Sequence, residues 1–187
     1  MVSTNDFKNG MAIEVDGRPF TIVEFQHVKP GKGGAFVRTK LKNLDTGAVL
    51  DKTFRAGEKF HRLRVESKKM LYLYSTPEEV ELMDNETYEQ LSLPRAAVGD
   101  SLRFVKDNVD VELLTIDGAP AGITPPIFVE LAITETQPGL KGDTVSGGSK
   151  PATVETGAAV NVPLFLKVGD IIKIDTRSGE YVERVSS

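Results

Sequence analysis

The stretch of this sequence best suited to reach a partner chemically is a run of six residues rich in glycine. Glycines accept positive φ and carry no side chain, while proline fixes one backbone dihedral. The flanking runs EFQHV and AFVRTKLK alternate as strands do, so the six residues are predicted to form a hairpin loop. This thin projection, here called the tip loop, consists of Lys29, Pro30, Gly31, Lys32, Gly33 and Gly34. Its most prominent side chain is Lys32, whose amine is open to an anionic partner or to a modifying enzyme.

The strand after the tip loop is predicted to carry positive charge on one face. Side chains two residues apart share a face of a strand. One face then holds Phe36 and three cations, and the other holds Val37, Thr39 and Leu41, which suit a core. The three cations, Arg38, Lys40 and Lys42, are called the basic strand face below. Such a face suits contact with RNA phosphates, although a solvated strand with a plain turn remains the alternative. Four more cations could extend it: Arg55, Lys59, Arg62 and Arg64.

Motifs for catalysis or metal binding are weak. The sequence has no cysteine and no GxSxG motif, and its two histidines, His27 and His61, match no metal-ligand spacing. The GKGG run precedes a strand, whereas a phosphate-binding P-loop opens a helix. The pair Glu78 and Glu79 lies in a polar turn and is interpreted as solvated surface. We therefore expect neither an enzyme nor a resident metal or cofactor.

Charge is unevenly distributed along the 187 residues. The net charge is −4, yet residues 1–64 hold 12 Lys and Arg against 7 Asp and Glu, while residues 65–128 hold 5 against 12. A basic first third can steer one end of an acidic chain to an anionic partner. No apolar run approaches the roughly 18 residues of a membrane span, and no secretory pattern opens the chain. These features favour a cytoplasmic protein without a membrane partner.

The recurrent short runs of Val, Ile, Phe, Thr and Tyr predict an all-β fold. Turns at Asp16-Gly17 and at Asp45-Thr46-Gly47 predict two hairpins. Further strands are expected in KKMLYLYS, VELMD, SLRFVKD, VDVELLTIDG, IFVELAIT, AAVNVPLFL, DIIKIDT and EYVERV. The segments NETYEQLSL and PRAAVGD favour a turn or two of helix at most. Two similar stretches, AVGDSLRF and KVGDIIKI, are both interpreted as a turn entering a strand.

The strand spacing favours three small barrels of about 60 residues each. The charge change near residues 64–67 and the Pro125-Pro126 pair mark the boundaries. The predicted domains are 1–64, 65–127 and 128–187.

Many of these segments resemble bacterial translation elongation factor P over the whole chain. The resemblance is carried by NDFKNGMAIEVDG, HVKPGKGGAFVR, KTFRAGEK, ETYEQL, TPPIFVEL, PGLKGDT, KPATVETGAAVNVPLFLKVGD and DTRSGEYVERV. It implies an N-terminal SH3-like (KOW-type) domain and two OB-fold domains, arranged in an elongated, tRNA-like shape. It also implies a factor, monomeric and not an enzyme, that binds both ribosomal subunits beside peptidyl-tRNA and relieves stalling at consecutive prolines.

Residue roles follow from the same resemblance. Lys32 is the functional tip near the CCA end of the tRNA, where a lysine-modifying enzyme would extend it. Gly142, Asp143 and Thr144 match the loop that contacts the small subunit and the messenger RNA. The chain has Gly34 where one subgroup of the family has glutamine, so a lysyl-type extension, a shorter amino-alcohol chain and no modification all stay open. The competing interpretation is a β-barrel adaptor that binds RNA or protein away from the ribosome.

Overall fold

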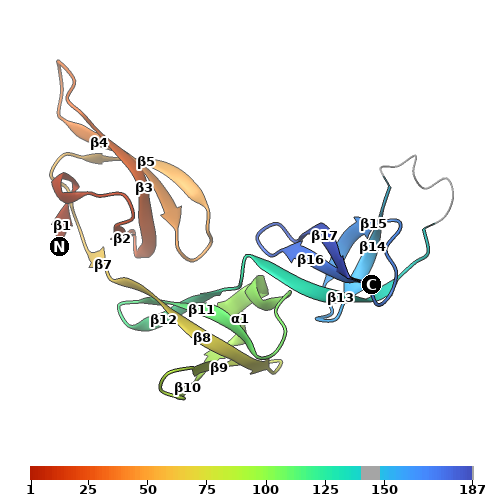
Figure 1. The fold of residues 1–187 in the computed structure, drawn as a ribbon. Helices are drawn as coiled ribbons and strands as arrows, with labels where there is room; N and C mark the ends of the chain where they lie inside the picture. The colour runs from red at the N-terminus through yellow and green to blue at the C-terminus, as the bar shows by residue number, and fades with distance from the viewer. Residues whose placement is uncertain (140–147, 187) are drawn as a thin grey trace. The chain divides into compact units, whose positions relative to one another are not determined.

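The computed structural model of the chain describes residues 1–139 and 148–186. Over these residues the chain forms three five-stranded antiparallel sheets and one two-stranded sheet (Figure 1). Two compact units result, one of Met1–Ser67 with Leu114–Gly122 and one of Lys68–Leu113 with Ile123–Ser187. The all-β prediction is confirmed. No helix in the described part of the chain has the length and apolar character needed to cross a bilayer.

The first sheet has the strand order β5-β4-β3-β2-β7. Its strands are β2 (Ala12–Val15), β3 (Arg18–Val28), β4 (Phe36–Asn43), β5 (Val49–Arg55) and β7 (Arg62–Leu63). A short ribbon of β1 (Val2–Ser3) and β6 (Lys59–Phe60) closes it beside a 3-10 turn at Thr4–Asp6. The core is made by Phe7, Ile13, Val15, Phe20, Ile22, Val37, Leu41, Phe54 and Phe60.

Both predicted hairpins of this sheet are confirmed. Asp16 (φ 52°) and Gly17 (φ 74°) join β2 to β3, and two successive positive φ values match the twist of a two-residue hairpin. Between β4 and β5, the Asn43 side chain accepts hydrogen bonds from the amides of Asp45 and Thr46, at 2.8 and 3.1 Å. These bonds hold the turn closed, so β5 returns in register along β4.

The second sheet has the order β10-β9-β8-β11-β12. Its strands are β8 (Val65–Ser75), β9 (Glu79–Asp84), β10 (Gln90–Pro94), β11 (Val109–Ile116) and β12 (Ala119–Thr124). The helical turn expected in NETYEQLSL is wrong. Asp84 accepts hydrogen bonds from the Glu86 and Thr87 amides and Tyr88 takes φ 60°, which turns the chain so that β10 pairs with β9.

The strand predicted in SLRFVKD is also wrong. Helix α1 (Arg95–Val98) continues directly into a 3-10 turn at Gly99–Leu102. Phe104 and Val105 are then both buried, which breaks the two-residue period of a strand, because Val105 joins the core of the second sheet and Phe104 that of the third. The similarity between AVGDSLRF and KVGDIIKI therefore reflects turn chemistry, and only the second stretch enters a strand.

The third sheet has the order β15-β14-β13-β16-β17. Its strands are β13 (Phe128–Thr136), β14 (Ser149–Val154), β15 (Ala159–Pro163), β16 (Ile171–Asp175) and β17 (Glu180–Ser186). Strand β14 escaped the sequence analysis because it contains Pro151. That proline is tolerated because the pairing of β14 with β13 ends at Ala152.

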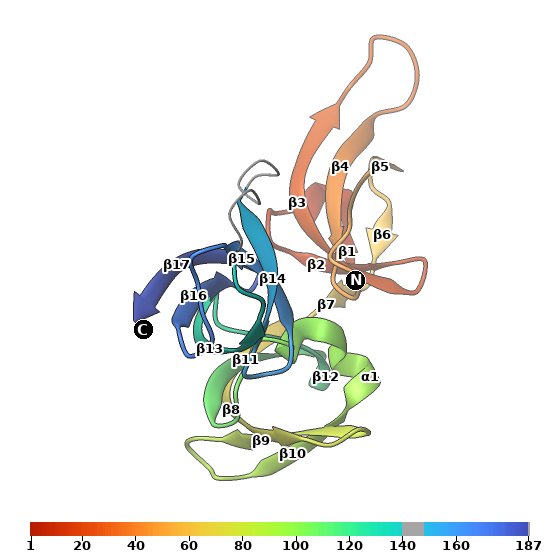
Figure 2. The ribbon, with the colours of Figure 1, turned by 90° about the vertical axis from the view of Figure 1, so that its right-hand side faces the viewer.

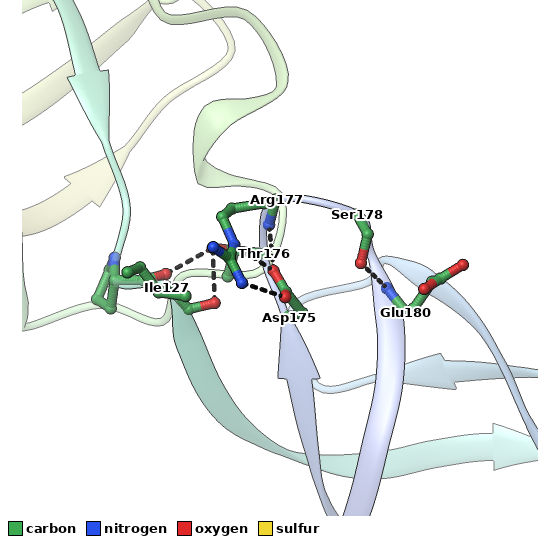
Figure 3. Close-up of polar contacts among 7 residues, drawn as sticks. Ile127, Asp175, Thr176, Arg177, Ser178 and Glu180 are labelled. Atoms are coloured by element: carbon green, nitrogen blue, oxygen red, sulfur yellow. Dashed lines mark hydrogen bonds and ion pairs between the residues drawn. The ribbon is translucent and has the colours of Figure 1, made fainter.

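The end of β16 is tied to the segment that follows the Pro125-Pro126 pair (Figure 3). The Thr176 hydroxyl lies 2.5 Å from the carbonyl oxygen of Pro126 and 3.1 Å from that of Ile127. Arg177 donates to both carboxylate oxygens of Asp175, and these hydrogen bonds lower the pKa of Asp175 to about 2. The entry into β13 is thus fixed by the Thr176 side chain, which follows β16, the strand next to β13 in the sheet.

Candidate nucleic-acid interface

The tip loop extends past the ends of β3 and β4, as Figures 1 and 2 both show. Pairing stops at Val28 and Phe36, and every residue of the tip loop is exposed. Within residues 1–139 and 148–186, no side chain forms an ion pair or hydrogen bond with Lys29 or Lys32. The amine of Lys32 is therefore presented to solvent at the end of a stem built from two paired strands.

The glycines of the tip loop are not all required by the fold of the chain itself. Gly33 has φ 100°, a conformation that favours glycine. A Cβ atom added at Gly31, Gly33 or Gly34 would meet nothing within 4 Å. Neither strain nor crowding within the described part of the chain therefore demands glycine at 31 and 34.

The base of the tip loop is anchored to the end of β5. The amide of Ala56 donates to the carbonyl of Ala35 at 3.1 Å. The carbonyl of Arg55 accepts from the amide of Glu58 at 3.1 Å and from the Thr4 hydroxyl at 3.4 Å. Thr4 is fully buried, and its hydroxyl oxygen also accepts from the Gly57 amide at 2.7 Å. The loop therefore starts from a fixed position on the sheet.

The two faces of β4 separate as the sequence predicted. Val37, Thr39 and Leu41 are buried, while Arg38 and Lys42 are exposed. Lys40 is half-buried, because its side chain contacts Glu24 on the neighbouring strand β3.

Lys40 is paired with an acid. Its ammonium lies 2.7 Å from a carboxylate oxygen of Glu24, its partner on β3, and Asp51 is its partner on β5. The hydrogen bond from Lys40 to Glu24, followed by the charges of Glu24 and Asp51, raises the pKa of Lys40. Glu24, Lys40 and Asp51 lie opposite one another on β3, β4 and β5, and this row of paired residues holds one cation and two anions. The basic strand face is therefore interrupted at its middle member.

The residues directly opposite Arg38 are neutral. Its partners across the sheet are Gln26 and Thr53, and its guanidinium carbon lies 5.5 Å from the ring centroid of Phe36. Phe36 in turn pairs with Arg55 on β5. Of the four cations expected to extend the basic strand face, Arg55 alone is thus brought beside it by strand pairing.

The other three cations that were expected to extend the basic strand face lie away from it. Lys59 belongs to the β1–β6 ribbon, and Arg62 lies in β7, at the opposite edge of the sheet from β5. Arg64 forms an ion pair with Glu66 at 2.5 Å.

The histidines do not form a metal site. The ring of His27 meets that of Phe25 edge-on at 5.6 Å, and His61 Nε2 lies 3.6 Å from a carboxylate oxygen of Asp117. No group of three His, Cys, Asp or Glu side chains that could hold a metal ion occurs in the part of the chain that the structure describes.

Gly142, Asp143 and Thr144 lie outside the described residues. The structure does describe two residues close to this segment in the sequence, Gly139 and Lys150. Lys150 is buried, and its ammonium donates to the carbonyls of Gln137 and Leu166 at 2.5 and 2.6 Å. A Cβ atom at Gly139 would lie 2.6 Å from the carbonyl oxygen of Leu164. Sequence reasoning missed Lys150, since nothing in the pattern distinguishes a buried lysine from a solvated one.

Comparisons with known proteins match all three sheets to one family. Residues 3–60 match the "Elongation factor P (EF-P) KOW-like domain", residues 65–123 the "Elongation factor P (EF-P) OB domain" and residues 129–184 "Elongation factor P, C-terminal". The chain belongs to the elongation factor P family. The elongation factors P of Pelotomaculum thermopropionicum and Moorella thermoacetica are 54% and 56% identical to it, over 99% and 98% of this chain and 100% of each relative. 

A solved structure described as eukaryotic translation initiation factor 5A from Methanococcus jannaschii is 26% identical, with a TM-score of 0.52. The match covers 66% of this chain and 91% of that one.

Membership of the elongation factor P family confirms the resemblance seen in the sequence. It also confirms the prediction of three small β domains, one KOW-like and two related to OB folds. The family is one of translation elongation factors and not of enzymes.

Proposed function

We propose that this chain acts in the cytoplasm as a monomer that binds both ribosomal subunits beside peptidyl-tRNA and promotes peptide-bond formation at consecutive prolines. The observation that carries the proposal is the unpartnered amine of Lys32 on a loop whose Gly31 and Gly34 the fold itself does not need. A loop without side chains around its lysine can enter a narrow cavity lined by RNA. In this proposal the chain has three domains, 1–64, 65–127 and 128–187. Together they would distribute the contacts with the ribosome and tRNA along the length of the bound tRNA.

The exposed Lys32 and its narrow loop support a mechanism in which the factor positions the end of the peptidyl-tRNA. Polyproline favours a stiff, extended conformation, which makes the reactive geometry of the peptidyl-tRNA harder to reach. Holding reacting groups in place lowers the entropic part of a barrier. The ammonium of Lys32 would bind the CCA end of the tRNA and limit its motion, while the ribosome supplies the chemistry.

The remaining tip and strand residues have supporting roles in this proposal. Lys29 and the glycines bring backbone and charge close to the CCA end, and Arg38 and Lys42, the two members of the basic strand face without an acid opposite, contact the RNA backbone. Gly142, Asp143 and Thr144 would contact the small subunit and the messenger RNA. The exposure of Lys32 also makes its amine accessible to a lysine-modifying enzyme.

The test is the substitution Lys32→Ala, with Lys8→Ala as the control. Both lysines are exposed side chains of the same domain, so the two variants lose the same charge. We expect both to unfold at the wild-type temperature and only Lys32→Ala to lose relief of stalling on a polyproline message. Equal synthesis rates for Lys32→Ala and wild type would contradict the proposal. Failure of the wild-type protein to co-sediment with ribosomes, together with binding to another RNA or protein, would favour the adaptor.

A further inference from the structure

The cations that surround the foot of the tip loop are arranged across two strands rather than along one. We propose that Arg55 on β5 joins Arg38 on β4 in binding the phosphates of one RNA strand at this foot, while Lys40 takes no part. This inference rests on the proposed function, since it concerns how the same domain holds the end of the tRNA.

Strand pairing places the two arginines on one face. Phe36 is opposite Arg55 and Arg38 is opposite Thr53. Arg38 and Arg55 are therefore diagonal neighbours, a relation that separates residues by about 7–8 Å. Two long arginine side chains at that spacing can engage one phosphate or two neighbouring phosphates.

The charge of each row decides where a phosphate can lie. The row of Arg38 and the row of Phe36 and Arg55 contain no acid, because their other members are Gln26, Thr53 and Val28. The next row holds Lys40 between Glu24 and Asp51, with a net charge of −1. A phosphate would be attracted to the first two rows and repelled by the third.

The guanidinium of Arg38 and the backbone of Arg55 are both restrained before any RNA arrives. The stacking of Arg38 on the half-buried ring of Phe36 limits the positions of its guanidinium. The backbone of Arg55 is fixed on both sides, since its carbonyl accepts from Glu58 and Thr4 and its amide donates to the Glu58 carboxylate at 3.1 Å. The bond to the backbone amide keeps the Glu58 carboxylate at the turn.

The side chain of Arg55 makes no ion pair or side-chain hydrogen bond with any of residues 1–139 or 148–186. Its substitution should therefore leave the fold intact. An exposed cation on a fixed backbone, without a partner in its own chain, is suited to a contact with another molecule.

The experiment measures equilibrium binding to ribosomes that carry peptidyl-tRNA, over a series of salt concentrations. Each phosphate contact with a single strand contributes about 0.7 to the slope of log affinity against log salt. We expect Arg55→Gln to lower that slope by about 0.7 and to weaken binding about fivefold at about 0.1 M salt. The matched control is Arg62→Gln, which removes the same charge at the opposite edge of the sheet and should bind with the wild-type slope. The double variant Glu24→Gln with Lys40→Gln keeps the net charge of the protein. It should also bind with the wild-type slope.

The outcomes separate this inference from the proposed function. If Arg55→Gln keeps the wild-type slope while Lys32→Ala loses relief of stalling, the inference is wrong and the proposed function stands. If Arg62→Gln weakens binding as much as Arg55→Gln, the effect is one of net charge and the inference is again wrong. A wild-type protein that does not bind ribosomes overturns both. Unfolding temperatures of all variants, measured in the same buffers, show whether each remains folded.

Discussion

Releasing Lys40 from its acidic partner should strengthen binding to RNA. The substitution Glu24→Gln removes the carboxylate that lies 2.7 Å from the Lys40 ammonium and keeps a side chain of the same length. The pKa of Lys40 is raised by the hydrogen bond to Glu24. Without that bond the pKa of Lys40 returns towards the ordinary lysine value of 10.5, so the group stays charged at neutral pH. Both side chains are solvent-exposed, and exposed ion pairs contribute little to folding stability.

The size of the effect follows from the charges of one row of the sheet. With Glu24 neutral, the row of Lys40 and Asp51 changes from a net charge of −1 to zero. Lys40 then becomes available as one more cation for a phosphate. One added contact raises the salt slope by about 0.7, which corresponds to at most about fivefold tighter binding at about 0.1 M salt. Asp51 remains beside Lys40 and holds the gain below that limit.

The assay compares wild type, Glu24→Gln and the double variant Glu24→Gln with Lys40→Gln in ribosome binding between low and high salt. The single variant should bind more tightly with a steeper slope, and the double variant should return to the wild-type slope because the released cation is gone. An unchanged slope for the single variant would refute the claim that Glu24 neutralises Lys40. A gain that persists in the double variant would show that the lost negative charge, and not Lys40, is responsible.

Three further predictions concern stability. Phe104→Ala removes a ring that is 2% exposed, so it should cost roughly 3–5 kcal/mol and lower the unfolding temperature by about 6–20 °C in calorimetry. Gly139→Ala places a Cβ atom 2.6 Å from a carbonyl oxygen and should lower the unfolding temperature, whereas Gly31→Ala meets nothing within 4 Å and should not. The Lys68 ammonium and two backbone amides lower the pKa of Asp84 from 3.8 to about 2. Because the folded pKa is the lower one, the stability that Asp84 contributes is complete above about pH 5 and is lost as the pH falls towards 2. The gap between the unfolding temperatures of wild type and Asp84→Asn should therefore close over that range, and a constant gap would contradict this.

Local patterns in the sequence were sufficient to predict strands that bury one face and turns in which particular residues dictate the backbone conformation. The Asp16-Gly17 hairpin and the alternation of Val37, Thr39 and Leu41 follow from such rules, and the structure confirms both. These periodicity rules fail where neighbouring residues of one segment pack into two different hydrophobic cores. Phe104 and Val105 are adjacent and both buried because they belong to different cores, so no single period describes them.

The candidate interface was predictable in its residue types and only partly in its charges. The sequence places Arg38, Lys40 and Lys42 on one face, but it does not show which acids lie opposite. The pairing of Lys40 with Glu24 depends on a bulge between Ile22 and Glu24, where the register of β3 shifts by one residue. A bulge inserts one extra residue and bends the strand, and the run Ile22, Val23 and Glu24 contains no glycine that would mark one.

The tip loop sets an energetic condition on how the proposed complex forms. Ordering a residue costs roughly 1–2 kcal/mol of backbone entropy, so fixing all six residues of a loop without internal contacts could cost up to about 6–12 kcal/mol. Two arginine–phosphate contacts, at about fivefold in affinity each, offset only a small part of this. Pro30 and the fixed base at Ala35 reduce the cost, since one has a restricted φ and the other is hydrogen-bonded to Ala56. The remainder has to come from the contacts of Lys32 and its loop with the CCA end and from contacts of the body of the protein. A variant that weakens the body contacts should therefore lower relief of stalling even when Lys32 is untouched, and adding more protein should restore it. Lys32→Ala should resist such rescue at any concentration.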